Sequence, residues 1–269
     1  MATDGSPFAQ SATAFAGDLA RALKAEVTLL AAFREEEPLR SREVLEEARN
    51  LLGDLEPPPQ AISLIGFADE AIIEYLADTP TDLLVIGAFG DRGVTRFLIG
   101  STAQRLVQHA PTSVLIVKGS QPKFSKILAC MEVGDNIVVD VATRLAKALN
   151  ADLQLLHVVP PSAAMYLTLP DQIELPLGQI LNQDTPLARH LRTCLTKLEA
   201  LDLDGKAIKV RRGAVPDAIF QEARAGAFDL ILIGSQSGPV QDHYFIGGIA
   251  ERVVTHAHRS VLVVHTTRP

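Results

Sequence analysis

The 269-residue sequence has only two cysteines, no tryptophan and few aromatic residues. Cys130 and Cys194 lack a CxxC motif and have no histidines at metal-ligand spacing, so we expect two packed, reduced thiols rather than a redox or zinc site. No apolar stretch approaches the roughly 18 residues of a membrane span, and no signal-peptide pattern precedes Asp4. These absences predict a cytoplasmic protein without a membrane partner.

Several catalytic and nucleotide-binding motifs are also missing. Gly205-Lys206 is followed by Ala207 rather than Ser or Thr, so there is no P-loop, and neither GxGxxG nor the GxSxG nucleophile elbow occurs. His256 and His258 are the one histidine pair at close spacing, but His256 repeats His109 at a predicted helix end, which favours a capping role. We therefore expect no metal site and no catalytic residue.

Charge and composition define the class further. Apolar residues make up 47% of the chain, which predicts a globular fold with a substantial core. The net charge of −7 disfavours nucleic acid as a partner, because such partners are bound through excess positive charge.

The sequence contains an internal repeat. Ala20–Leu30 matches Ala146–Leu156 at an offset of 126 residues, and Val107–Val117 matches Val254–Val264 at an offset of 147. The offset grows by 21, so the second copy carries an insertion. Because this period is far longer than the 20–50 residues of solenoid repeats, a duplicated domain is the better interpretation.

Each copy alternates short β-branched runs with segments of helical periodicity, which predicts parallel strands joined by crossover helices on both faces. The pattern breaks at Gly119–Pro122, so we place one domain at residues 1–119 and the other at 125–269. The insertion, 160–186, contains five prolines and many large apolar residues. It should pack over the second half or against another chain.

One motif suggests a ligand. A buried strand ends at Gly87, Gly90 follows, and nine residues later Gly100, Ser101 and Thr102 open a predicted helix. Glycines let a ligand approach the backbone, and a helix start offers unpaired N–H groups at the positive end of its dipole. This arrangement suits phosphate.

Together with Thr3-Asp4-Gly5-Ser6 at the end of the first strand and His109-Ala110-Pro111 before the last, this motif resembles the universal stress protein family. The likeness covers nearly the whole chain as two tandem copies. It implies doubly wound five-stranded parallel sheets in order 3-2-1-4-5, of the adenine nucleotide alpha hydrolase-like type. It also implies ATP binding in one branch of the family and no nucleotide in another.

The resemblance implies a ligand role for each matching residue. Asp4 would bind ribose or adenine, and Gly66 would border the pocket. From their place in the loop between Gly90 and Gly100, Arg92 and Arg96 could neutralise the phosphates of ATP, bound alone or with Mg²⁺. Ordinary structural roles are the alternatives: a turn cap, tight turns, helix N-capping and solvated arginines. The candidate set is Asp4, Gly66, Gly87, Gly90, Arg92, Gly100, Ser101 and Thr102.

The second half has lost most of these groups. Ser237 replaces Gly90, Gly248 replaces Ser101 and Ile249 replaces Thr102, while the loop before Gly247 contains no Lys or Arg. Glu132 aligns with Asp4, with Val133 and Gly134 in place of Gly5 and Ser6. The second half is therefore interpreted as a degenerate copy.

The first half departs from the family at its first strand. Met1 aligns with Ala129, so Lys126, Ile127 and Leu128 have no counterparts. Either the true start lies upstream or the sheet tolerates a shortened central strand.

The leading hypothesis is an ATP-binding module with a regulatory or sensing role and at most slow ATP hydrolysis. The alternatives are a scaffold without nucleotide and an ATP-using adenylating enzyme on a related fold. The last strand of each half, Val114–Val117 and Val261–Val264, would lie at a sheet edge. The family resemblance suggests that these edges pair antiparallel within the chain as an internal pseudo-dimer; pairing between chains in a homodimer is the alternative.

Overall fold

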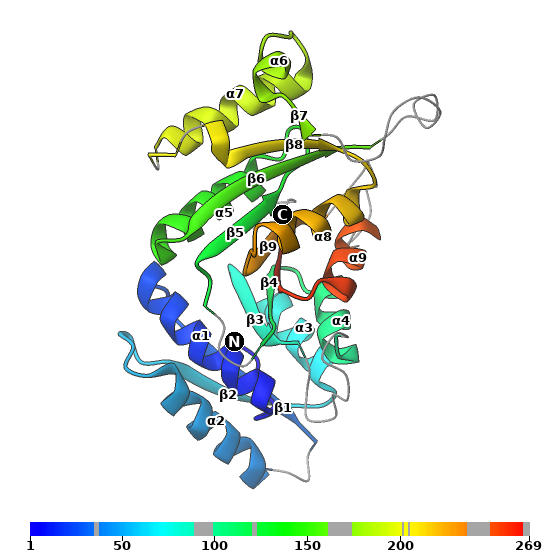
Figure 1. Cartoon of the computed structure of the whole chain (residues 1–269). Helices are drawn as coiled ribbons and strands as arrows, with labels where there is room; N and C mark the ends of the chain where they lie inside the picture. Colours follow the sequence, from blue (N-terminus) through cyan, green and yellow to red (C-terminus); the bar gives the residue numbers. More distant parts are fainter. Residues whose placement is uncertain are drawn as a thin grey trace.

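The structure is a computed structural model that describes residues 1–34, 38–88, 99–119, 123–160, 174–200, 202–203, 205–235 and 248–265 (Figure 1). The first half contains, in chain order, α1 (Pro7–Leu23), β1 (Thr28–Phe33), α2 (Pro38–Leu52), β2 (Gln60–Ile65), α3 (Ala68–Asp78), β3 (Leu83–Gly87), α4 (Ser101–His109) and β4 (Ser113–Val117). The second half contains β5 (Lys126–Cys130), α5 (Asn136–Leu149), β6 (Asp152–Val159), β7 (Glu174–Leu175), α6 (Leu177–Leu181), α7 (Pro186–Glu199), the 3₁₀ helix η2 (Gly205–Ala207), β8 (Ile208–Arg212), α8 (Val215–Ala225), β9 (Leu230–Gly234), α9 (Gly248–His256) and β10 (Ser260–Val264). The predicted α/β alternation is confirmed.

The second half has the predicted sheet. Its strands lie in the order β8-β6-β5-β9-β10 and are all parallel, so the first strand of the domain, β5, is central. Ile127 of β5 pairs with Leu153 on one side and with Leu230 on the other. β7 adds an antiparallel strand outside β8, which covers an edge that would otherwise be free.

In the first half, the central strand is reduced to a few residues. The Ala2 amide donates to the Val85 carbonyl (3.0 Å), and the Thr3 amide donates to the Leu30 carbonyl (2.9 Å). This segment therefore lies between β1 and β3, although its one ladder contact is the isolated bridge Ala2–Leu30. As a result β1 and β2 form a separate two-stranded sheet, while β3 and β4 belong to the large one.

The register of Asp4 follows from these bonds. Thr3 donates to Leu30, and in the second half Met131 donates to Leu156 (3.0 Å), so Asp4 and Glu132 are equivalent, as the sequence alignment predicts. The alignment is wrong one residue further on. Gly5 (φ +78°) and Gly134 (φ +91°) are the glycines that precede the helix caps, so Gly134 corresponds to Gly5, and Val133 is an added residue.

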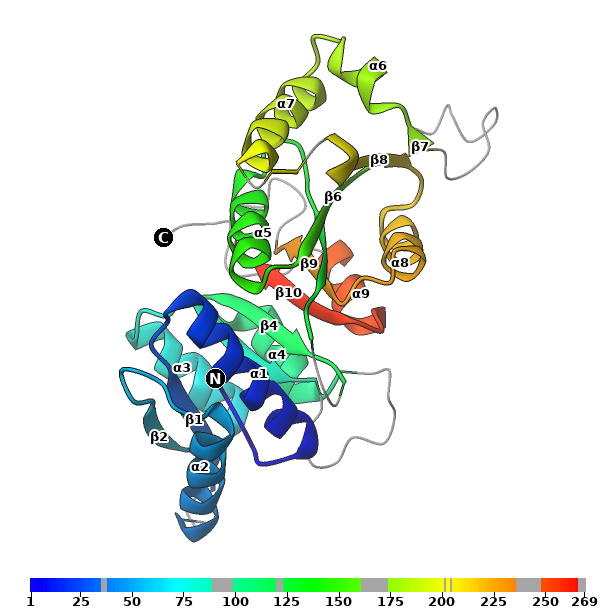
Figure 2. The same cartoon turned by 60° about the vertical axis from the view of Figure 1, so that its left-hand side comes forward.

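The two halves join through their last strands. β4 and β10 pair antiparallel, with Leu115 opposite Leu262, which makes one eight-stranded sheet in the order β3-β4-β10-β9-β5-β6-β8-β7 (Figure 2). The Lys118 amide donates to Ser260 Oγ (2.9 Å), and the His265 amide donates to the equivalent Ser113 Oγ (3.1 Å). These matching contacts give the junction a pseudo-two-fold symmetry. The intrachain pairing suggested by the family resemblance is confirmed.

Helices cover both faces of the sheet. One core packs side chains of α1, α2, α5 and α7 against the sheet, and the other packs α3, α4, α8 and α9 against the opposite face. Both cores run through the junction, with Leu115 and Leu262 in the first and Ile116 and Val261 in the second. Cys130 and Cys194 are free, buried thiols, as predicted.

The described part of the insertion packs on the second half. Leu175 pairs with Val210, Ile180 is buried, and Leu177 contacts the core. The expectation that the insertion covers the second half is thus confirmed for residues 174–186, whereas 161–173 lie outside the described residues. Among the helices that the structure describes, none is long and apolar enough to cross a membrane.

Lys118 allows a test of the junction by pH. Its Nζ donates to the Val254 and Ala257 carbonyls (3.0 and 2.7 Å) at the end of α9, and burial lowers the pKa of Lys118 to about 8. Between that value and 10.5, the unfolded chain binds the proton more strongly than the folded one. The contribution of Lys118 to the free energy of unfolding should therefore rise with pH in this window, by on the order of 3 kcal/mol.

The measurement is urea unfolding of wild type and Lys118→Met at pH 7, 9 and 10.5. The wild-type advantage in unfolding free energy should increase across this range. The exposed Lys123→Met controls for loss of one charge. A difference that stays flat or shrinks with pH would contradict this account.

Candidate functional site

The described candidate residues of the first half lie at one edge of the sheet. Asp4, Gly66 and Gly87 each follow or end a strand of the parallel set, so they share its carboxyl edge. The Gly100 amide donates to the Ala88 carbonyl (2.8 Å), which brings the start of α4 to the same edge. In doubly wound folds ligands bind at this edge. Gly90, Arg92 and Arg96 lie outside the described residues.

Asp4 takes part in a local turn. Its Oδ1 accepts a hydrogen bond from the Ser6 amide (3.0 Å), and Ser6 Oγ in turn accepts from the Ala9 amide (3.4 Å) as the N-cap of α1. The Asp4 side chain is half-buried. The turn role considered from the sequence is therefore present, and it occupies one carboxylate oxygen of two.

Gly87 is required by packing. A Cβ atom at this position would lie 2.8 Å from the Ala9 amide nitrogen and 2.8 Å from the Phe8 carbonyl carbon. The end of β3 therefore passes so close to the start of α1 that no side chain fits. Gly66 has a φ of +134°, and Gly213, its equivalent in the second half, has +152°. Since both halves need glycine at that turn, Gly66 does not by itself indicate a ligand.

The start of α4 is open to a ligand. Its N-cap residue, Gly100, has no side chain, so no side-chain cap bonds the first-turn amides. Ser101 and Thr102 follow at the first two helical positions, and both are exposed. The first-turn amides, two hydroxyls and the positive end of the helix dipole therefore meet at one place.

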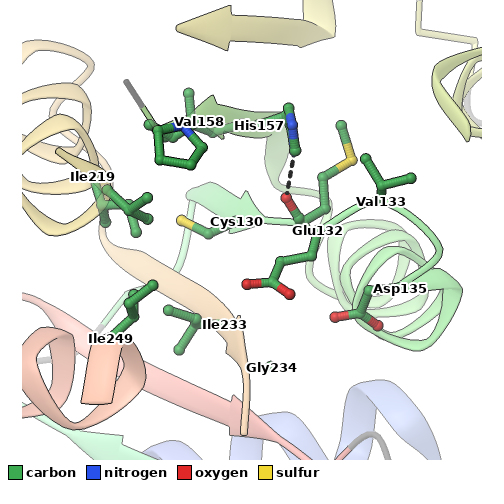
Figure 3. A pocket seen from close by; sticks show the side chains of 14 residues that line it. Cys130, Glu132, Val133, Asp135, His157, Val158, Ile219, Ile233, Gly234 and Ile249 are labelled. Carbon is green, nitrogen blue, oxygen red and sulfur yellow. Dashed lines mark hydrogen bonds between the residues drawn. The ribbon is translucent and has the colours of Figure 1, made fainter. Parts of the chain in front are cut away.

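The second half has a cavity at the equivalent edge. It measures about 420 Å³ and is lined by residues at the carboxyl ends of β5, β6 and β9 and by the facing helices (Figure 3). Glu132, Gly234 and Ile249 of its lining are the counterparts of Asp4, Gly87 and Thr102. Sequence reasoning recognised the loss of the phosphate-binding groups but not that the crevice persists. The alignment of the strand ends of the second half with those of the first was the sequence signal that could have located this cavity.

The cavity has apolar walls and a few polar groups. Ile219, Ile233 and Ile249 line one side, and His157 bonds the Met131 carbonyl through Nδ1 (3.0 Å) at another (Figure 3).

Two titratable groups of the cavity have shifted pKa values. Burial raises the pKa of Asp135, which caps α5 by accepting from the Val138 amide (3.2 Å); that bond opposes the shift, and the charge of Glu132 adds to it. Burial also raises the pKa of the Cys130 thiol, so it stays protonated. Within the part of the chain that the structure describes, no group of three His, Cys, Asp or Glu side chains could hold a metal ion.

The fold defines a tandem, doubly wound α/β protein whose candidate residues and described cavity lie at the carboxyl edges of its strands. The family model for universal stress proteins matches residues 1–118 and again 123–265. The chain therefore belongs to the universal stress protein family, with two copies of its domain.

Individual relatives agree with this assignment. A Thermus aquaticus universal stress protein, encoded in the 3' region of a QAH/OAS sulfhydrylase gene, is 32% identical over 133 residues, covering 44% of this chain and 96% of the relative. A Methanocaldococcus jannaschii universal stress protein is 38% identical over 55 residues, which cover 20% of this chain and 32% of that protein.

Solved structures show the same fold. A functionally unknown protein from Pseudomonas aeruginosa PAO1 superposes with a TM-score of 0.67 at 18% identity, covering 94% of this chain and 86% of its own. A universal stress protein from Archaeoglobus fulgidus DSM 4304 gives a TM-score of 0.63 at 17% identity, covering 99% and 97%.

A pair of alanine substitutions tests the close approach at Gly87. Gly87→Ala should destabilise the fold by about 1–3 kcal/mol, because its Cβ would meet the backbone of α1. Gly248→Ala is the matched control, since its Cβ would enter open space at the start of α9. Urea unfolding measures both. Equal stability of the two variants would show that α1 and β3 are further apart than described.

Proposed function

We propose that this universal stress protein binds one ATP per chain, in its first half, and acts as a regulatory or sensing module rather than as a dedicated enzyme. The observation that carries the proposal is the difference between two equivalent helix starts. α4 begins with exposed Ser101 and Thr102, whereas α9 begins with Gly248 and Ile249. The first set can donate hydrogen bonds to phosphate, and the second lacks both hydroxyls.

The start of α4 supplies the phosphate contacts in this proposal. Hydrogen bonds to a charged group contribute about 1.5–3 kcal/mol each. The two hydroxyls can each donate one to phosphate, and the backbone amides of the first helical turn can donate more. The hydrogen bond from the Gly100 amide to the Ala88 carbonyl holds the start of α4 beside the end of β3.

The rest of the nucleotide would lie along the strand ends. The second oxygen of the Asp4 carboxylate would accept from a ribose hydroxyl or the adenine edge, and Gly66 would border this part of the crevice. Gly90 and Arg92, in the segment between Ala88 and Ile99, would approach the phosphates, with Mg²⁺ as an accompanying ion.

A regulatory role fits the chemistry of the first-half residues. Among the candidate residues that the structure describes there, Asp4 is the one with an acidic side chain, and its carboxylate closes a turn. A general base needs to reach the proton that it abstracts. Hydrolysis should therefore be slow, and the protein should act in the cytoplasm through the bound or empty state of this site.

A swap between the halves tests the proposal. Ser101→Gly with Thr102→Ile gives α4 the residues of α9, and should weaken ATP binding by roughly 100- to 10,000-fold because two charge-assisted hydrogen bonds, of about 1.5–3 kcal/mol each, are lost. Isothermal titration calorimetry should give one site per wild-type chain. The reciprocal change, Gly248→Ser with Ile249→Thr, is the control and should leave the wild-type site unaltered.

Two equivalent sites in wild type, or unchanged affinity in the first variant, would contradict the proposal. If wild type binds no ATP, the nucleotide-free scaffold becomes the better interpretation.

A further inference from the structure

The cavity of the second half is built for a different class of ligand. It occupies the position that corresponds to the proposed ATP site, and its volume of about 420 Å³ lies in the range of pockets for small molecules. A crevice is therefore present in the half that lacks the helix-start hydroxyls of α4.

Its surroundings disfavour phosphate. None of the described lining residues is Lys or Arg. Lys209 and Arg211 of the nearby β8 both bond the buried Glu222 (each 3.1 Å) and do not line the cavity. Among the described residues, a phosphate in this cavity would therefore meet no Lys or Arg side chain.

Its walls favour an apolar body. Ile219 of α8, Ile233 of β9, Ile249 of α9 and Val158 of β6 face the cavity (Figure 3). Leu156 of β6 also lines it. Ile249 lies where the first half has Thr102, so an alkyl group replaces a hydroxyl at the start of the helix. Binding of an apolar ligand would remove this surface from water.

The polar groups of the cavity favour positive charge. Figure 3 shows the Glu132 carboxylate directed among the lining residues, with Asp135 nearby at the start of α5. Asp135 is engaged as the cap of that helix. Within the described part of the chain, the Glu132 side chain makes no hydrogen bond or ion pair, so its charge is available to a ligand.

We propose that the second half binds a small organic cation, with its apolar body against the isoleucines and its protonated amine beside Glu132. This inference does not depend on ATP binding in the first half. The carboxylate selects an amine over a neutral or anionic head group, while the walls select an uncharged alkyl or aryl body.

Three probes that share a phenyl body and differ in the head group test the preference for an amine: 2-phenylethylamine, 2-phenylethanol and phenylacetate. Each is titrated into the full chain at pH 7, and binding is followed by saturation-transfer NMR. The amine should bind about five-fold more tightly than the alcohol, which corresponds to about 1 kcal/mol for a solvent-accessible ion pair. Phenylacetate should bind most weakly. The inference is overturned if the alcohol or the acid binds as tightly as the amine, or if none of the three binds.

Two variants assign the effect to the site. Glu132→Gln should abolish the preference for the amine while leaving affinity for the alcohol unchanged. The matched control, Glu70→Gln, removes an exposed carboxylate of α3 and should leave the preference intact. Ile249→Phe should weaken binding of both amine and alcohol by filling the cavity. Retention of the preference in Glu132→Gln, or unchanged binding in Ile249→Phe, contradicts the inference.

Saturating ATP separates this site from the proposed nucleotide site. It should not displace the amine from the wild-type chain. Displacement would place nucleotide in the second half and overturn the inference, whereas failure of wild type to bind ATP at all bears on the first half alone.

Discussion

The antiparallel pairing of β4 with β10 is the constraint on which the rest of the structure depends. Each strand ends the parallel series of its half and would be an exposed apolar edge if the halves were apart. Their pairing buries both edges and merges the cores on the two faces. Because the strands of the two halves run in opposite directions, the two carboxyl edges lie at opposite ends of the common sheet. The candidate residues of the first half therefore do not share an edge of the sheet with the cavity of the second half.

Duplication followed by this pairing explains how the halves can differ in chemistry. The second half supplies half of the junction, so its sheet must be kept even if its ligand changes. Its central strand β5 has five residues and pairs on both sides, whereas the first half has only the segment around Ala2 in that place. The second half thus has the more complete sheet but lacks the glycine and hydroxyl motif. The first half has that motif, but its β3 and β4 belong to a sheet completed by the second half.

Much of this architecture could be predicted from the sequence because it rests on periodic patterns. The repeat offsets located matching strands, and the family resemblance suggested the antiparallel pairing of the two last strands; the register, with Leu115 opposite Leu262, came from the structure. Local turn geometry was harder. The added residue at Val133 is recognised only when the positive φ angles of Gly5 and Gly134 are known. The packing role of Gly87 was also hidden, since it depends on α1, which is distant in sequence. The cavity of the second half arises from side chains of several elements, and no single motif encodes it.

The central claim is that equivalent helix starts in the two halves have different ligands, with phosphate bound only at α4. Hydrogen–deuterium exchange with and without ATP and Mg²⁺ tests it most directly, because it reports on both helix starts in one wild-type molecule. The account predicts that ATP slows exchange in peptides covering residues 99–105 and leaves peptides covering 248–254 unchanged. Equal protection of both segments, or protection of the second alone, would contradict it.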